Sequence, residues 1–381
     1  MKLKSTLAFI SATTRSVDWR LSFVPFIMAC VYLWSSLFNI GFSLGSLSVF
    51  ALSVCTTFGF AALGYFINEF FDKADDLKAE KINKLSLISR RWQLALFIVI
   101  LSACFLPWLY LPKNTITFYL ILAELSCFIL YSAPYLRMKR STYFAGILDA
   151  LYAYLIPGLL SYHTYSLLAS RLSSSVPILF FLALFFIGYR NIFLHQIKDI
   201  LGDQKAGMIS LPMRLGVKSS YVFLKLLYFL ELVLILSFSV ELIFIDKRYM
   251  PCLLLAIIYL GYVQADLLKI FKGATYFALL PIRHVLDLLY QLWFPLLQLS
   301  ILVWIDWRWV IIVPFHLLFF VNRDFIVTFY GRTIDYLWHR SLRHLLSAVL
   351  NYPIFLLFKM FGVDLIKENK SALSYLKNKF R

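Results

Sequence analysis

The stretch Asn68-Glu69-Phe70-Phe71-Asp72-Lys73-Ala74-Asp75-Asp76 lies at the end of a long apolar segment. Asn68, Asp72 and Asp76 are four residues apart, so on a helix their side chains lie on one face, nearly above one another. Three oxygen-bearing side chains in a row suit a hard cation such as Mg²⁺, which takes oxygen ligands and commonly bridges to phosphate oxygens. The stretch therefore predicts a helix that ends in a metal-binding face.

A second polar stripe follows a later apolar segment, again with one residue in every four. Its members are Asn191, His195, Asp199 and Asp203. A single D-x-x-x-D pattern is also consistent with solvated helix-end charges, because Lys73 and Lys78 are close enough in sequence to pair with the carboxylates. Two such stripes, each ending an apolar helix, favour a shared binding site.

The composition is that of a multi-span membrane protein. Of the 381 residues, 61% are hydrophobic, 18% are aromatic and only 15% are charged, whereas a soluble domain carries about 25% charged residues. Apolar runs of roughly 20 residues recur, and each is long enough to cross a bilayer as a helix. Strand-like alternation is absent, which argues against an outer-membrane barrel. The predicted class is an all-α membrane protein.

We expect about nine transmembrane helices, with a shorter tenth candidate at 309–321. The nine predicted spans are 21–42, 47–70, 93–111, 115–134, 144–164, 175–196, 221–244, 250–268 and 286–305. On this basis the chain divides into an amphipathic lead-in (1–20), a transmembrane domain (21–305) and a C-terminal extension (306–381). From about residue 322, basic residues are mixed with aromatic and aliphatic ones, which is typical of helices lying on an anionic membrane surface. The extension is either a structural tail or a regulatory, partner-binding segment.

The formal charge of +17 could indicate nucleic acid as a partner, but the placement of the cations indicates membrane lipids instead. When the loops are assigned alternately to the two sides, twenty lysines and arginines fall on one side and five on the other. The twenty are Lys2, Lys4, Arg15, Arg20, Lys73, Lys78, Lys81, Lys84, Arg90, Arg91, Arg137, Lys139, Arg140, Lys198, Lys205, Arg214, Lys218, Lys269, Lys272 and Arg283, and the five are Lys113, Arg171, Lys247, Arg248 and Arg308. Because the cation-rich side faces the cytoplasm, the N-terminus and both acidic stripes are predicted to be cytoplasmic.

Two carboxylate stripes with lysine and arginine nearby fit a diphosphate held through Mg²⁺. Metal ions and cations would neutralise the charge that builds on the phosphate oxygens as the leaving group departs. The aromatic-rich helices behind the stripes could house a long hydrocarbon chain and stabilise a carbocation through the ring faces. These features are what the ionisation of an isoprenyl diphosphate requires.

The chain resembles the UbiA superfamily of intramembrane prenyltransferases over roughly residues 10–305. The first motif of that family is N-D-x-x-D-x-x-x-D, and its fixed positions hold Asn68, Glu69, Asp72 and Asp76. The second motif is close to D-x-x-D-x-x-G-D-x-x-x-G-x-x-T-L-P, and its positions hold Gln196, Asp199, Gly202, Asp203, Gly207, Ser210, Leu211 and Pro212. Two loops resemble basic loops of the family, namely the one with Lys81, Asn83 and Lys84 and the segment from Tyr131 to Arg140.

The resemblance implies nine helices around a central cavity that is capped on the cytoplasmic side. It further implies that Asn68, Asp72 and Asp76 bind one Mg²⁺ on the diphosphate and that Asp199 and Asp203 bind a second. Lys81, Lys139 and Arg140 would contact diphosphate oxygens.

Several positions depart from the family pattern. Glu69 replaces an aspartate and keeps its charge, whereas Gln196 replaces the first aspartate of the second motif and removes one carboxylate. His195 beside it is either a hydrogen-bonded packing residue or a group that binds the acceptor or removes a proton. Arg190 and Asn191 lie about one helical turn deeper and are expected to line the cavity. Asp149, inside the fifth span, is either a helix–helix hydrogen-bond partner or a polar group of the acceptor pocket.

The leading hypothesis is a Mg²⁺-dependent prenyltransferase in which an allylic cation is captured by an acceptor in the cavity. The acceptor and the prenyl chain length stay open. A terpene cyclase of the same superfamily differs only in capturing the cation within the same molecule. A hypothesis of a different class is an ion-coupled transporter, which would place acidic residues and broken helices near the membrane midplane.

Overall fold

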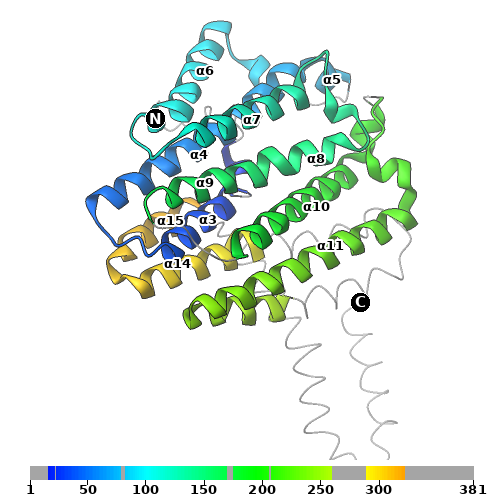
Figure 1. The fold of residues 1–381 in the computed structure, drawn as a ribbon. Coiled ribbons are helices and arrows are strands. Elements are labelled where there is room, and N and C mark those ends of the chain that lie inside the picture. The colour runs from blue at the N-terminus through cyan, green and yellow to red at the C-terminus, as the bar shows by residue number, and fades with distance from the viewer. Residues whose placement is uncertain are drawn as a thin grey trace, which may run out of the picture. The chain divides into compact units, whose positions relative to one another are not determined.

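The computed structural model describes residues 16–21, 23–78, 82–169, 175–205, 207–259 and 289–321, and over these ranges every regular element is helical (Figure 1). The all-α prediction is therefore confirmed. The longer helices are α4 (Leu44–Phe71), α6 (Arg90–Phe105), α7 (Thr115–Ser132), α10 (Val176–Lys205) and α11 (Leu211–Ile245). The shorter helices are α2 (Ser16–Arg20), α3 (Val24–Leu37), α5 (Lys73–Lys78), α8 (Phe144–Ala150), α9 (Ile156–Ser166), α14 (Phe294–Ile305) and α15 (Val313–Phe319).

Short 3₁₀ and π segments join or extend these helices. They are η1 (Lys84–Leu87), η2 (Leu106–Leu109), η3 (Met138–Arg140), η4 (Leu151–Leu155), η5 (Lys247–Tyr249), η7 (Leu289–Trp293) and η8 (Trp307–Ile312). Residues 250–259 are also helical.

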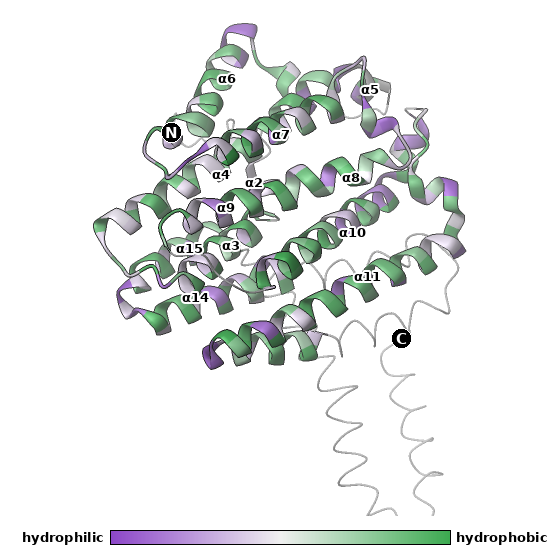
Figure 2. Ribbon diagram, viewed as in Figure 1, coloured by the Kyte–Doolittle hydropathy of each residue, from purple (hydrophilic) through white to green (hydrophobic). Residues whose placement is uncertain are grey.

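Six helical segments of the described chain are long and apolar enough to cross a membrane. They are Leu44–Phe71, Arg90–Leu109, Thr115–Ser132, Phe144–Ser166, Val176–Lys205 and Leu211–Ile245. Shorter apolar helices cover Val24–Leu37, Leu289–Ile305 and Trp307–Phe319. Hydrophobic residues dominate the middle of the helices, and hydrophilic residues gather at their ends, notably around α5 (Figure 2). The chain is an integral membrane protein.

Three predicted spans have the wrong limits. The first was expected to run to residue 42, but α3 ends at Leu37, and Asn39 then adopts a left-handed backbone (φ 50°). The sixth was expected to end at residue 196, but α10 continues to Lys205 and so carries the whole second stripe. The residues just before the seventh predicted span were expected to form a loop, but helix α11 already begins at Leu211. Pro212 suits the first turn of a helix, and Gly216 (φ 74°) allows the helix to kink.

Two prolines each cause a wider, π-helical turn in the helix that contains them. Pro157 has no N–H to donate to the carbonyl of Ala153, and its ring clashes with that carbonyl, so the preceding turn opens into the π segment η4. Pro295 has the same relation to Gln291 and the π segment η7. Both π segments carry residues that line the central cavity. The prolines thus set the local geometry of the cavity wall.

Helices α8 and α10 approach closely because Gly188 has no side chain. A Cβ atom on Gly188 would lie 2.9 Å from the Cα atom of Ala150, a distance that would force the helices apart. This contact holds Asp149, next to Ala150, beside the helix that carries the second stripe. Helix α10 also packs along α11, as Figure 1 shows.

The end of the bundle opposite the stripes is closed by Asp306, which ends α14 and caps η8. Its carboxylate accepts hydrogen bonds from the backbone N–H of Phe42 (2.8 Å) and of Arg308 (3.1 Å) and pairs with the Arg308 guanidinium (2.8 Å). These hydrogen bonds, that from Arg308 above all, hold the pKa of Asp306 well below its usual range. Residues 306–321, expected to begin a separate extension, thus pack against α3 and its following loop. The remainder of that extension and residues 1–15 lie outside the described residues.

We predict that Asp306→Ala lowers the stability of the folded protein by about 1–2 kcal/mol, because a helix cap and the bond to Phe42 are lost. Since the pKa of Asp306 is lower in the folded than in the unfolded state, this contribution is present at neutral pH and fades as the pH falls below about 4. Thermal unfolding in lipid nanodiscs measures the effect. Asp306→Asn is the matched control, and it should retain part of the capping; equal losses in both variants would contradict the capping role.

Candidate active site

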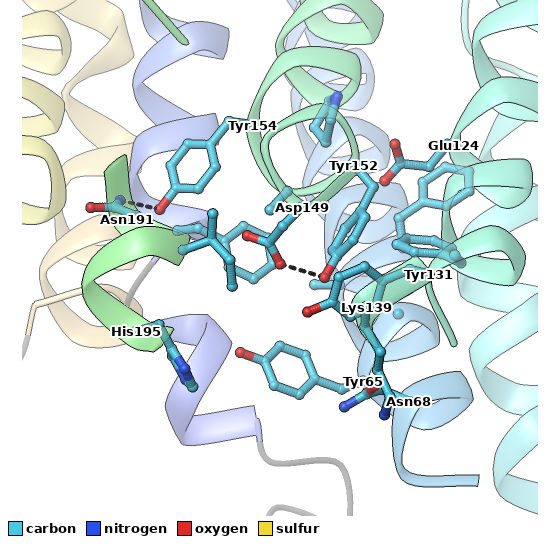
Figure 3. A pocket seen from close by; sticks show the side chains of 18 of the residues that line it. Tyr65, Asn68, Glu124, Tyr131, Lys139, Asp149, Tyr152, Tyr154, Asn191 and His195 are labelled. Atoms are coloured by element: carbon cyan, nitrogen blue, oxygen red, sulfur yellow. Dashed lines mark hydrogen bonds between the residues drawn. The ribbon is translucent and has the colours of Figure 1, made fainter. Parts of the chain in front are cut away.

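Both polar stripes line one cavity of about 390 Å³ inside the bundle. The first stripe contributes Asn68, Asp72 and Asp76, and the second contributes Asn191, His195, Asp199 and Asp203, all predicted as site residues. Lys139 and Gln196, also predicted, line the same cavity. The fold therefore brings together predicted site residues from helices α4, α5 and α10 and from the loop before α8 (Figure 3).

The first stripe is held in place by neighbouring polar side chains. The Ser132 hydroxyl at the end of α7 donates to Oδ1 of Asn68 (3.4 Å). The Asn83 amide donates to Oδ2 of Asp76 and to the backbone carbonyl of Glu69, both at 2.8 Å. Asn83 thus fixes the short helix α5 against the end of α4. It belongs to the loop that resembles the family's basic loop, and its role here is to position a carboxylate.

Asp72 is the most strongly paired carboxylate of the first stripe. Lys139 Nζ donates to Oδ1 of Asp72, and Arg137 Nη2 lies 3.5 Å from the same oxygen. Arg137 also donates to the backbone carbonyl of Phe71 (3.4 Å) and has a left-handed backbone (φ 34°), which is uncommon for a residue with a side chain. The loop before α8 is therefore bent so that two cations face one carboxylate.

Lys139 is largely enclosed, and its pKa is lowered to about 8 by burial and by the neighbouring Arg140 cation, while Asp203 partly opposes the shift. The side chain therefore carries its proton at neutral pH and loses it as the pH rises through about 8. Arg140 itself is exposed and is not among the residues that line the cavity. Lys81, the third predicted cation, lies outside the described residues.

In the second stripe, His195 lies beside Asp199, with 3.6 Å between Nδ1 and Oδ2. Both side chains are partly exposed, and both face the cavity together with Asp203. In the described ranges, no group of three histidine, cysteine, aspartate or glutamate side chains converges tightly enough to hold a metal ion without other ligands. A metal bound here would therefore need further oxygen ligands from water or from a ligand in the cavity.

Aromatic side chains form the wall beyond the polar mouth. The Tyr152 ring packs edge-on against Phe128 (5.2 Å between centroids) and Tyr131 (5.3 Å). The Tyr152 hydroxyl donates to Oδ1 of Asp149 (2.5 Å), and both residues line the cavity (Figure 3). Asp149 is therefore a cavity residue, not a helix–helix contact.

A buried ion pair lies behind the cavity wall and was not expected from the sequence. Arg190 on α10 pairs with Glu231 on α11 (2.5 Å from Nε to Oε2), and the Tyr290 hydroxyl donates to Oε1 of Glu231. Arg190 also donates to Oδ1 of Asn191 (2.7 Å), whose amide donates to the Tyr154 hydroxyl (2.6 Å). The prediction that Arg190 lines the cavity is wrong: its guanidinium turns toward Glu231, and it instead orients Asn191, which does line the cavity.

Several other cavity residues were also overlooked, among them Tyr65, Glu124 and Tyr154. They lie at isolated positions within apolar helices, with no spacing pattern to mark them. The π segment η4 turns Tyr154 toward the cavity, and the signal for it in the sequence is Pro157. An ionisable residue inside an apolar span is itself a signal of function, and Glu124 could have been found on that basis.

The fold and the cavity define a class: a multi-span helical membrane protein with paired carboxylate stripes at the mouth of an intramembrane chamber. The sequence profile of the UbiA prenyltransferase family matches residues 22–280, and the chain belongs to this family. A comparison with curated protein sequences gives no match.

Solved structures share the fold at low sequence identity. A UbiA homologue from Archaeoglobus fulgidus bound to GPP and Mg²⁺ superposes with a TM-score of 0.55 and 18% identity, covering 77% of this chain and 99% of that chain. The same homologue bound to DMAPP and Mg²⁺ gives 0.54 and 18%, with 77% and 98% covered. A structure of digeranylgeranylglyceryl phosphate synthase gives 0.53 and 20%, with 78% and 98% covered. These likenesses confirm the UbiA fold.

We predict that Glu231→Leu destabilises the protein by about 3–5 kcal/mol, because it leaves the Arg190 guanidinium buried without its counter-charge. The double variant Arg190→Leu/Glu231→Leu should recover much of this loss. Thermal unfolding in nanodiscs reports both effects. Glu241→Leu, ten residues along the same helix and only half-buried, is the control and should change little; a double variant as unstable as the single one would contradict the pairing.

Proposed function

We propose that the protein transfers an isoprenyl group from an isoprenyl diphosphate, held with Mg²⁺, to an acceptor bound in the same cavity. The observation that carries this proposal is that Asp72, Asp76, Asp199 and Asp203 share one cavity with the cation Lys139. Membership of the family supports prenyl transfer, and similarity to structures bound to GPP or DMAPP with Mg²⁺ supports the type of donor.

The residues present fit Mg²⁺. Asn68, Asp72 and Asp76 offer oxygen atoms from one side of the mouth, and Asp199 and Asp203 offer them from the other. Oxygen ligands are those that Mg²⁺ prefers, and it usually keeps water or substrate phosphate in its shell. When bound, the metal would neutralise negative charge on the departing diphosphate.

Lys139 has a second role in this proposal. It contacts Asp72 and lines the cavity, where it is placed to bind phosphate oxygens when a diphosphate enters, whereas Arg137 pairs with Asp72 and is not among the residues that line the cavity. A cation aimed at the leaving group stabilises the charge that develops in the transition state. Asn83 meanwhile keeps Asp76 in position through its amide.

The aromatic side chains of the cavity wall act, in this proposal, on the isoprenyl part of the substrate. Once the diphosphate leaves, the allylic cation in this proposal lies beside the rings of Phe128, Tyr131 and Tyr152, which line the cavity. Ring faces attract a cation through their quadrupole, and an enclosed apolar wall keeps water from capturing it. The wall therefore favours transfer over hydrolysis.

The acceptor lies, in this proposal, between Asp149 and the second stripe. Asn191 and Gln196 offer amides to it, and His195, whose Nδ1 atom lies beside Asp199, can take up the proton that the acceptor loses on alkylation. If the cavity holds no acceptor, the cation could react within the same molecule, which is the cyclase alternative. We further propose that the mouth faces the cytoplasm, as the asymmetry of basic residues indicates.

We predict that Asp72→Ala or Asp199→Ala lowers turnover at least about 100-fold, because the leaving diphosphate loses part of its binding site. Diphosphate release from labelled geranyl diphosphate and Mg²⁺ in nanodiscs, supplied with a lipid extract as the acceptor source, measures this loss. Glu241→Ala, remote from the cavity, serves as the control. Normal turnover in either aspartate variant would overturn the site assignment. A cyclic hydrocarbon formed without any extract would identify a cyclase.

We also predict that the KM for the isoprenyl diphosphate rises as the pH increases through about 8, since Lys139 then loses its proton and its attraction for the anion. The group is charged below its pKa, so binding is strongest on the acid side of this value. Lys139→Arg should remove this rise, because a guanidinium stays protonated throughout the range. An unchanged pH profile in the arginine variant would show that another group is responsible.

A further inference from the structure

A chain of hydrogen bonds runs from the buried ion pair to the cavity wall. Arg190 donates through Nε and Nη2 to the two carboxylate oxygens of Glu231 (2.5 and 3.3 Å) and through Nη1 to Oδ1 of Asn191 (2.7 Å). Arg190 is fully buried, whereas Asn191 is partly exposed and lines the cavity. One guanidinium therefore joins an interior charge pair to a residue of the cavity wall.

The Arg190 guanidinium also fixes which way the Asn191 amide points. A guanidinium has five N–H donors and no acceptor, so the amide turns its oxygen, and not its nitrogen, toward Arg190. The amide nitrogen then donates to the hydroxyl of Tyr154 (2.6 Å), a second residue of the cavity wall (Figure 3). The position and the polarity of the Asn191 amide are thus set by a charge that lies behind the wall.

Both π segments contribute a tyrosine to this chain of hydrogen bonds. Tyr154 belongs to η4 and accepts from Asn191, while Tyr290 belongs to η7 and donates to Glu231. The Arg190 guanidinium also lies 5.8 Å from the centre of the Tyr290 ring. The network therefore runs from η7 through α11 and α10 to η4, and it ties both proline-induced turns to one ion pair.

Stability alone does not account for a buried ion pair. Apolar residues of similar volume are often as stable, since burying two charges costs much of what their attraction gains. Proton transfer along the chain does not account for the pair either, because neither a guanidinium nor an amide side chain gives up a proton in a protein. The role that remains is to hold the neighbouring side chains in one orientation.

We propose that Arg190 and Glu231 are positioning residues that hold Asn191 and Tyr154 at fixed places in the cavity wall. This inference rests on the proposed prenyl transfer and adds two residues that do not themselves line the cavity. Their effect falls on the reaction inside the cavity, whereas the diphosphate binds at the mouth beside Lys139. Loss of the pair should therefore lower kcat and leave the KM for the isoprenyl diphosphate nearly unchanged.

The test uses Arg190→Leu/Glu231→Leu, in which both charges are removed together. Diphosphate release from labelled geranyl diphosphate with Mg²⁺ and the lipid extract gives kcat and KM in nanodiscs, and thermal unfolding shows that the variant is folded. We expect kcat to fall about tenfold, because the wall groups are no longer held in place, and KM to stay within about twofold. Asp306→Ala, which is remote from the cavity and expected to be less stable, is the control and should keep the wild-type kcat.

A triple variant separates positioning from a general structural role. Asn191→Leu alone should lower kcat at least as much as the leucine pair does. Adding Asn191→Leu to the leucine pair should then lower kcat no further than Asn191→Leu alone, since the pair acts through Asn191. Falls in kcat that multiply in the triple variant would overturn the inference, and so would a wild-type kcat in the folded leucine pair.

Arg190→Gln/Glu231→Gln takes the place of the leucine pair if that variant fails to fold. A glutamine at 190 can face Asn191 with either its oxygen or its NH₂ group, so the polarity of the Asn191 amide is no longer forced. Here too kcat should fall, and an unchanged kcat would contradict the positioning role. A wild type without Mg²⁺-dependent diphosphate release would count against the proposed function itself, whereas normal release with fully active pair variants would count against this inference alone.

Discussion

The arrangement of charged side chains at the cavity mouth depends on the attraction between Asp72 and the two cations that face it, Lys139 and Arg137. Carboxylates on α4, α5 and α10 repel one another when they line a single enclosed cavity, and cations nearby offset that repulsion. The loop before α8 delivers these cations through the left-handed backbone of Arg137. The same cations would be available to an anionic ligand, so in the proposed function the interaction that holds the mouth together also prepares it for a diphosphate.

Behind the mouth, the bundle uses two devices to keep polar groups inside a membrane protein. The first is full pairing: Arg190 and Glu231 neutralise each other, and the remaining donors of Arg190 orient Asn191. The second is exposure to the cavity, which Asp149 lines in place of contacting lipid. The π segment η4, which Pro157 imposes, turns Tyr154 to meet Asn191, so local backbone irregularity and the polar network act together.

Hydrophobicity and four-residue spacing were sufficient to predict the helical class and the two stripes at the mouth, whereas the role of Lys139 was expected only from the resemblance to the UbiA superfamily. The stripes could be found because each repeats every four residues at the end of an apolar run, although the structure divides the first between α4 and α5. The Arg190–Glu231 pair could not, since its members are 41 positions apart and only packing of α10 on α11 brings them together. Helix limits such as the end of α3 depend on a left-handed Asn39, which hydropathy does not report.

In the proposed function, the two stripes bind one diphosphate from opposite sides of a single cavity. The most direct measurement is an experimental structure with Mn²⁺ in place of Mg²⁺ and a thiolodiphosphate analogue of geranyl diphosphate, with the metal located by anomalous scattering. We expect metal density in the cavity between the Asp72 and Asp199 stripes, next to the diphosphate, with Lys139 turned toward a phosphate oxygen. A diphosphate bound elsewhere, or density at neither stripe, would contradict it.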